Sequence, residues 1–190
     1  MACSHPWKIR PATREDVPSI VWLTQVLAEY ENEPRSMKIG EKEMLRDGFG
    51  EKQYFHVLVA EWTSDDGPVL NSIPVDPEKP STSMPHNDRI VGHALYFYTY
   101  STWEGKCLHM EDLCVREQYR NRGIGTALMQ ECAKVACREG CARMIWQVLD
   151  WNTRAAELYE RIGGKILKEW LTIRLIQPEL GNFASGETKP

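Results

Sequence analysis

The chain has 190 residues, of which 42% are hydrophobic, and a formal net charge of −4 at pH 7. This length and composition suit one domain with a buried core. The mild acidity gives no reason to expect nucleic acid or an anionic membrane as a partner. No apolar run approaches the length that crosses a bilayer, and the N-terminus lacks the basic-then-apolar pattern of a signal peptide. These features predict a cytoplasmic protein.

The six cysteines show neither a C-x-x-C pair nor metal-ligand spacing with the five histidines. Several of them fall in segments with strand or helix patterns, where a free cysteine behaves as a small buried hydrophobic residue. We therefore expect free thiols in a reducing compartment and no metal site.

The first half of the chain contains two helical and two extended patterns. Apolar residues recur at helical spacing after Thr13, which opens a typical helix-start signature. The segment over 63–88 is rich in proline, serine and aspartate and predicts a mobile loop or insertion. In chain order we expect a strand over 7–12, a helix from Asp16 to Tyr30, a helix over 41–47 closed by Gly48, and a strand over 54–62.

The second half begins with two long strands joined by a turn and then alternates helices and strands. An antiparallel middle followed by β-α-β units predicts a mixed α/β sandwich, with one central mixed sheet of roughly six to seven strands flanked by about four helices. The whole chain, 1–190, would form a single domain. The expected elements are strands over 89–100 and 106–115 with a turn at 101–105, a helix ending at Gly140, a strand over 143–149, a helix capped by Asn152 and stopped by Gly163, a strand over 169–176, and a polar, frayed tail over 177–190.

A basic turn with two glycines stands between the strand that ends at Val115 and the helix that follows it. Glycines remove side chains, so a phosphate can approach the unpaired N–H groups at a helix start. Arg120 and Arg122 add positive charge beside them. The spacing excludes a nucleotide P-loop, because no Gly-Lys-Ser or Gly-Lys-Thr occurs, and the dinucleotide fingerprint, because Leu128 stands where its third glycine would be. A diphosphate cradle remains, with an ordinary glycine-bearing loop as the alternative.

Short segments spread over nearly the whole chain resemble the GNAT superfamily of acyltransferases. Within it, the spermidine/spermine acetyltransferase branch is most similar, including its thialysine acetyltransferase-like members. The matching segments are Ile9-Arg-Pro-Ala-Thr13, Leu27-Ala-Glu-Tyr-Glu31, Asp47-Gly-Phe-Gly50, Tyr100-Ser-Thr-Trp-Glu-Gly105, Glu111-Asp112, Tyr119-Arg-Asn-Arg-Gly-Ile-Gly125, Val148-Leu-Asp-Trp-Asn-Thr-Arg-Ala155 and Leu158-Tyr159.

The resemblance implies a GNAT-like fold and acetyl-CoA as the acyl donor. The glycine turn then becomes the site for the pyrophosphate of the coenzyme, and backbone N–H groups of the preceding strand would pair with its pantetheine arm. The residues expected to bind the coenzyme are Leu113, Cys114, Val115, Arg120, Asn121, Arg122, Gly123, Ile124, Gly125, Thr126, Asn152, Thr153, Arg154 and Ala155.

Two residues are expected to be catalytic. Tyr159 matches the tyrosine of the family that protonates the departing thiolate, although in isolation it would be interpreted as a core aromatic residue. Glu111 lies in an apolar strand, where an unpaired buried carboxylate would be costly. It is interpreted as a water-mediated base or as an anchor for the substrate ammonium. The alternative is a strand residue paired with an arginine.

The amine pocket is expected to include Tyr30, Glu31, Trp103 and Glu169 together with Glu111. Each has a plainer interpretation, as an exposed helix end, a hairpin cap or a solvated charge. The predicted function is acetyl transfer from acetyl-CoA to a small primary amine (thialysine, a lysine-like amino acid or a polyamine) by direct attack in a ternary complex. The alternatives are a protein lysine acetyltransferase and a non-catalytic acyl-CoA-binding module. A homodimer is implied by the resemblance alone.

Overall fold

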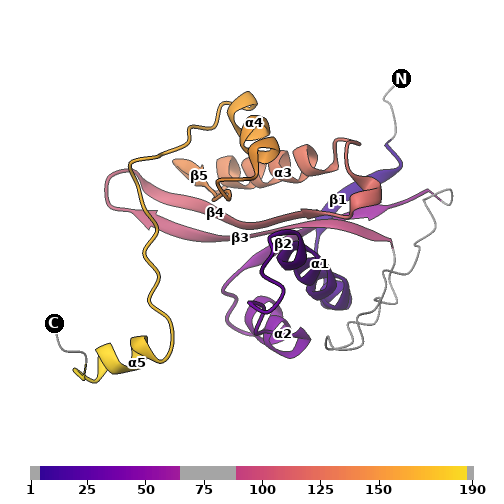
Figure 1. Ribbon diagram of the computed structural model, residues 1–190. Helices are drawn as coiled ribbons and strands as arrows, with labels where there is room; N and C mark the ends of the chain where they lie inside the picture. Colours follow the sequence, from indigo (N-terminus) through magenta and orange to yellow (C-terminus); the bar gives the residue numbers. More distant parts are fainter. Residues whose placement is uncertain (1–4, 65–88, 188–190) are drawn as a thin grey trace. The chain divides into compact units, whose positions relative to one another are not determined.

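The computed structural model describes residues 5–64 and 89–187. The chain divides into two compact units, Met1–Gln147 and Val148–Pro190 (Figure 1). Apart from Thr63 and Ser64, the insertion predicted over 63–88 lies outside the described residues. Within the described part of the chain, no helix has both the length and the apolar character needed to cross a bilayer.

A five-stranded mixed sheet forms the centre of the first unit, with the strands in the order β1-β2-β3-β4-β5. Neighbouring strands run antiparallel from β1 to β4, whereas β5 runs parallel to β4. The predicted α/β class with a central mixed sheet is confirmed, with fewer strands than expected. The strands are β1 (Trp7–Pro11), β2 (His56–Trp62), β3 (Ile90–Ser101), β4 (Gly105–Val115) and β5 (Arg143–Ile145).

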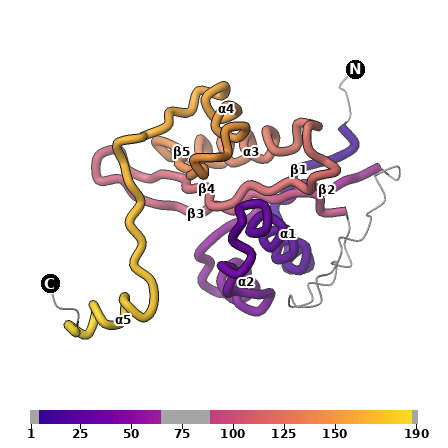
Figure 2. The backbone as a smooth tube through the Cα atoms, viewed as in Figure 1, coloured from indigo at the N-terminus to yellow at the C-terminus, as the bar shows by residue number. Residues whose placement is uncertain are grey.

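Helices cover both faces of this sheet. The helices α1 (Val17–Tyr30) and α2 (Glu41–Phe49) lie on one face, and α3 (Ile124–Arg138) lies on the other (Figures 1 and 2). Two short 3-10 turns precede α1 and α3, at Arg14–Asp16 and Glu117–Tyr119. A hydrophobic cluster between α1, α2 and the sheet makes up much of the core, including Ile20, Leu23, Met44, Val59, Leu95 and Cys114.

The start of α1 is held by charges and a capping contact. The backbone N–H of Thr13 donates to Asp16 Oδ2 at 2.8 Å. Arg10 of β1 donates to both carboxylate oxygens of Asp16, at 2.6 and 2.9 Å. Asp16 is buried, and a buried carboxylate is stabilised only when it is paired and hydrogen-bonded. These contacts therefore fix the start of α1 to β1 at the sheet edge.

The helix α2 runs past Gly48, so the prediction that Gly48 closes it was wrong. It ends at Phe49 and Gly50 is its C-cap. A Cβ on Gly48 would stand 2.4 Å from the ring of Phe55. Gly48 is therefore a point of close packing against Phe55 rather than a helix stop.

The strand predicted over 143–149 is shortened to the three residues of β5. It pairs only with Cys107–His109 of β4. Just beyond this ladder the register of β3 and β4 shifts, because Leu95 lies opposite Asp112 and Tyr96 lies opposite Met110. Glu111 is the extra residue of a β-bulge, which bends its strand. The two parallel strands therefore part after His109.

The second unit contains α4 (Thr153–Arg161) and the short α5 (Glu179–Ala184). The helix capped by Asn152 is confirmed, and α5 occupies part of the region predicted as a polar tail. The strand predicted over 169–176 does not form. Its alternating pattern suits a strand, but a strand needs a neighbour for its backbone groups, and this unit has no other strand among its described residues.

Candidate active site

The glycine turn adopts the backbone conformation that a phosphate cradle requires. Asn121 and Gly123 both have left-handed backbones, with φ of 64° and 80°. Gly123 is the N-cap of the 15-residue helix α3. Apart from its two chain neighbours, no described residue has an atom within 4 Å of where its Cβ would stand. The first intrahelical bond is donated by Ala127 to the Gly123 carbonyl oxygen. The N–H groups of the first turn, at Ile124, Gly125 and Thr126, therefore remain for a ligand.

Two arginines flank the cradle and both lie over aromatic rings. The Arg120 guanidinium is 5.0 Å from the ring centroid of Tyr30, the last residue of α1. Its Nε also donates a 3.0 Å hydrogen bond to the carbonyl oxygen of Val115. The Arg122 guanidinium is 5.5 Å from the ring centroid of Trp62. The cradle is thus connected through Arg120 to the end of β4 and to the end of α1.

Beside the cradle, the far edge of β4 pairs with no further strand among the described residues. In the described residues its ladder with β5 ends at the pair His109 and Ile145. The Arg116 N–H donates to Val91 of β3 at 2.8 Å. Because N–H groups alternate along a strand, those of Leu113 and Val115 point to the opposite edge. They are the donors that the sequence predicted for an acyl-transfer edge.

Cys114 faces α1. Its Sγ donates to the Leu23 carbonyl oxygen at 3.4 Å, and burial raises the pKa of its thiol to about 12. Cys114 is therefore no thiolate nucleophile at neutral pH.

The bulge brings two consecutive carboxylates to one face of β4. Glu111 Oε2 lies 3.3 Å from His109 Nε2, and the His109 ring stacks at 4.9 Å on Phe97, which packs on the α1 cluster. On the other side of the bulge, Asp112 shares its face with Cys114, which contacts α1. Without the bulge, neighbouring residues would point to opposite faces. Both Glu111 and Asp112 therefore face α1.

Glu31 brings a third carboxylate to this region. It is the C-cap of α1, and its pKa is raised by burial and by the negative charge of Asp112. Tyr30 precedes it and contacts Arg120. The structure thus brings together Tyr30, Glu31 and the cradle, and adds Asp112, which the sequence analysis missed. In the sequence, the adjacent carboxylates Glu111 and Asp112 were the indication of this role. Because side chains alternate along a strand, only one of the two was expected to face the site.

Among the described residues no group of acidic, histidine and cysteine side chains is arranged to hold a metal ion.

Trp103 lies away from these carboxylates in the described chain. It is 83% exposed in the turn between β3 and β4. It is nine positions from Asp112 along the chain, most of them in β4, which at ~3.3 Å per residue is on the order of 30 Å. The fold of one chain therefore gives no support to the prediction that Trp103 lines the amine pocket.

The remaining predicted site residues belong to the second unit. Asn152 caps α4, and its side chain accepts a 3.3 Å hydrogen bond from the Ala155 N–H. Thr153, Arg154 and Ala155 form the first turn of α4, and Tyr159 lies one turn further along. Glu169 lies in an irregular, exposed stretch after this helix.

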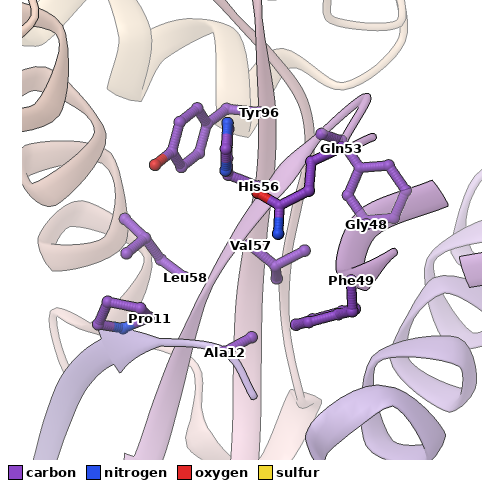
Figure 3. Close-up of a pocket in the computed structure, with 10 residues that line it drawn as sticks. Pro11, Ala12, Gly48, Phe49, Gln53, His56, Val57, Leu58 and Tyr96 are labelled. Atoms are coloured by element: carbon purple, nitrogen blue, oxygen red, sulfur yellow. The ribbon is translucent and has the colours of Figure 1, made fainter. Parts of the chain in front are cut away.

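A cavity of about 160 Å³ lies in the first unit, at the end of β1 (Figure 3). Its walls include Phe49 at the end of α2, Gln53, His56 of β2 and Tyr96 of β3. None of the predicted site residues lines it. The cavity is therefore separate from the cradle and from the three carboxylates.

Residues 42–164 match the model of the acetyltransferase (GNAT) family. The chain is 38% identical over 161 residues to the thialysine N-epsilon-acetyltransferase of Bos taurus, covering 85% of each chain. It is 37% identical over 170 residues to that of Mus musculus, covering 88% of this chain and 91% of the mouse protein. The fold is similar to that of an integron cassette protein from the mobile metagenome of V. cholerae, with a TM-score of 0.68 and 20% identity over 95% of this chain and 99% of the other.

Proposed function

The chain belongs to the acetyltransferase (GNAT) family, and from this premise we propose that it transfers acetyl from acetyl-CoA to a small primary amine. Thialysine, a lysine-like amino acid and a polyamine are the substrates to consider. The observation that carries the proposal is the contact of Arg120 with Tyr30. It joins a phosphate cradle to a helix end where Glu31 and Asp112 interact electrostatically, so an anion site and a cation site adjoin.

The residues of the first unit fit acetyl-CoA. The open space over Gly123, the left-handed turn and the free first-turn N–H groups of α3 suit a pyrophosphate. The open edge of β4 offers the N–H groups of Leu113 and Val115 to the pantetheine amides and to the thioester carbonyl oxygen. Bound acetyl-CoA would supply the activated acetyl group. On the resemblance to the family, Asn152, Thr153, Arg154 and Ala155 are also proposed to bind the coenzyme.

Carboxylates would recognise the substrate amine and accept its proton. A lysine-type ammonium has a pKa of about 10.4, so the neutral nucleophile costs about 4.6 kcal/mol at pH 7. Glu31 and Asp112 are proposed to hold the ammonium, because an additional positive charge relieves the repulsion between them. Glu111, more exposed and beside His109, is proposed to accept the proton directly or through water.

The attack is proposed to be direct. The amine would displace the coenzyme A thiolate, while the β4 edge donates hydrogen bonds to the developing oxyanion. Tyr159 is proposed to donate the proton that the thiolate takes up. Cys114 offers no route through an acyl-cysteine, because burial raises the pKa of its thiol to about 12.

Two other functions remain to be tested against this one. A protein lysine acetyltransferase would act on a peptide, and a non-catalytic module would bind acyl-CoA without turnover. The names of the relatives, thialysine acetyltransferases of two mammals, support the small-amine proposal. A cytoplasmic homodimer is proposed on the resemblance to the family, and light scattering of the purified chain would test the dimer.

One substrate panel separates the three functions. Acetylated products are identified by mass spectrometry after incubation with acetyl-CoA and either thialysine, lysine, ornithine, spermidine or a histone-tail peptide. The proposal expects kcat/KM at least tenfold higher for one of the small amines than for the peptide. A preference for the peptide would favour protein acetylation, and coenzyme binding without any product would favour the non-catalytic module.

A further inference from the structure

His93 is a fully buried histidine in the middle of the sheet. It lies on β3, opposite Val59 of β2 and Cys114 of β4, with none of its surface exposed. Directly opposite residues of neighbouring strands share a face. Because Cys114 faces α1, the imidazole also lies on the α1 face, the same face as Glu111 and Asp112.

Neither ring nitrogen of His93 has a hydrogen-bond partner among the described residues. Nearly all buried polar groups in proteins have a partner, so an exception of this kind calls for a reason. The nearest anion is Asp112, whose Oδ2 lies 3.9 Å from His93 Nε2. This distance is too long for a hydrogen bond. A small rotation of the carboxylate would close it.

Asp112 stands between the buried imidazole and the substrate region. Its side chain keeps 21% of its surface exposed, and its charge acts on Glu31 at the end of α1. One carboxylate thus lies between the buried imidazole of His93 and the region proposed for the substrate ammonium.

We propose that His93 is a positioning residue of the amine site, which orients the Asp112 carboxylate toward the ammonium of the substrate. The inference rests on the proposed function. The ring N–H of His93 would donate to Asp112 and hold the carboxylate toward the substrate.

Several charged or titratable groups act on the same place. On β4 they are Asp112, Cys114 and Arg116, and Glu31 adds a charge at the end of α1. Arg120 acts on Cys114 from the cradle, while the guanidinium of Arg116 lies 4.5 Å from the ring of Trp22 on α1. Burial and Asp112 raise the pKa of Glu31, so the variants are compared at one pH.

The kinetic test uses His93→Gln and His93→Phe with thialysine as the amine. Glutamine keeps an N–H donor, and phenylalanine keeps the ring shape without one. At pH 8 we expect the KM for thialysine in His93→Gln to stay within about twofold of the native value, because the N–H donor is retained. In His93→Phe, KM at pH 8 should rise about 5- to 20-fold, because the carboxylate loses the donor that orients it, while kcat changes little.

A purely structural role for His93 makes a different prediction. His93→Phe would then retain the native KM for thialysine. That result would overturn the proposal. Thermal unfolding of each variant shows whether the fold is retained, and His93→Gln remains informative if the phenylalanine does not fit.

A second measurement does not depend on activity. The imidazole ring N–H signals of the native chain are recorded by NMR, and the His93 signal is identified by its loss in His93→Gln. Replacing Asp112 by asparagine should move that signal to higher field, because a hydrogen bond to a charged acceptor is stronger than one to a neutral acceptor. An unchanged signal would refute the coupling. If no amine is acetylated, the proposed function fails, whereas this comparison still decides whether His93 and Asp112 act together.

Discussion

Arg120 Nε donates a 3.0 Å hydrogen bond to the carbonyl oxygen of Val115. The same guanidinium lies 5.0 Å from the ring centroid of Tyr30. One side chain thus connects the end of β4, the cradle and the end of α1. The positions of the anion site and of the cation site are therefore coupled, and a substitution of Arg120 should affect binding at both sites.

Arg120→Lys tests this coupling, because lysine keeps the positive charge and loses the planar Nε donor. We expect the KM values for acetyl-CoA and for the amine to rise together, by about tenfold, since a hydrogen bond to a charged group contributes about 1.5 to 3 kcal/mol. The matched control is Arg122→Lys, whose guanidinium lies over Trp62 and which should leave the amine KM unchanged. Full activity of Arg120→Lys would mean that Arg120 supplies charge alone.

The two glycines of the cradle should respond differently to alanine. Gly123 has a φ of 80°, where a Cβ costs about 1 to 2 kcal/mol of stability. A Cβ on Gly125 would meet Val115 at an ordinary 3.8 Å, and alanine favours a helix by up to about 1 kcal/mol over glycine. Gly123→Ala should therefore lower the unfolding free energy, and Gly125→Ala should not.

Acetyl-CoA affinity completes the comparison of the two glycines. If the phosphates approach the N–H groups of the first turn, Gly125→Ala should raise the dissociation constant about tenfold without loss of stability. Calorimetric titration of both variants measures this. Native affinity in Gly125→Ala would contradict a close approach at that position.

Tyr159→Phe tests the proposed general acid. Removing a positioned proton donor lowers kcat by about 100-fold or more, and the dissociation constant of acetyl-CoA should hold. Tyr54→Phe is the matched control, because Tyr54 is 59% exposed on the first unit and has no proposed role. General acid catalysis usually contributes much more than threefold to kcat. A kcat for Tyr159→Phe within threefold of the control would therefore exclude Tyr159 as the acid.

Glu31→Gln should stabilise the free protein and weaken amine binding. Burial and Asp112 raise the pKa of Glu31, so its ionised form is disfavoured in the folded state. Above the ordinary glutamate pKa of 4.5 this lowers stability progressively until Glu31 is fully ionised in the fold. The gain in melting temperature from Glu31→Gln should therefore be present at pH 8 and vanish toward pH 4, where Glu31 is protonated. A gain independent of pH would point to packing rather than charge.

Local patterns predicted the parts of the site that depend on neighbouring residues. The glycine turn, the start of α3 and the cap at Asn152 follow from glycine, arginine and asparagine at fixed offsets. The capping contact at Thr13 likewise depends on a carboxylate three residues ahead.

The features that the sequence did not predict depend on contacts between different segments of the chain. Strand alternation placed only one of Glu111 and Asp112 on the site face, whereas the bulge opposite Leu95 and Tyr96 turned both toward α1. No sequence pattern within β4 indicates this register shift, because the shift depends on how β3 pairs with β4. The close packing of Gly48 against the ring of Phe55 is likewise a contact that the helical pattern does not contain.

The most direct test of the account is the release of coenzyme A thiol by the purified chain at saturating acetyl-CoA, with and without thialysine, compared with Asp112→Asn. We expect thiol release that depends on the amine, with one acetylated product formed per thiol. In Asp112→Asn, the KM for the amine should rise about tenfold and the KM for acetyl-CoA should stay the same, as expected for loss of one charge partner of the ammonium. Thiol release that is independent of every amine tested, or an unchanged amine KM in Asp112→Asn, would contradict the account.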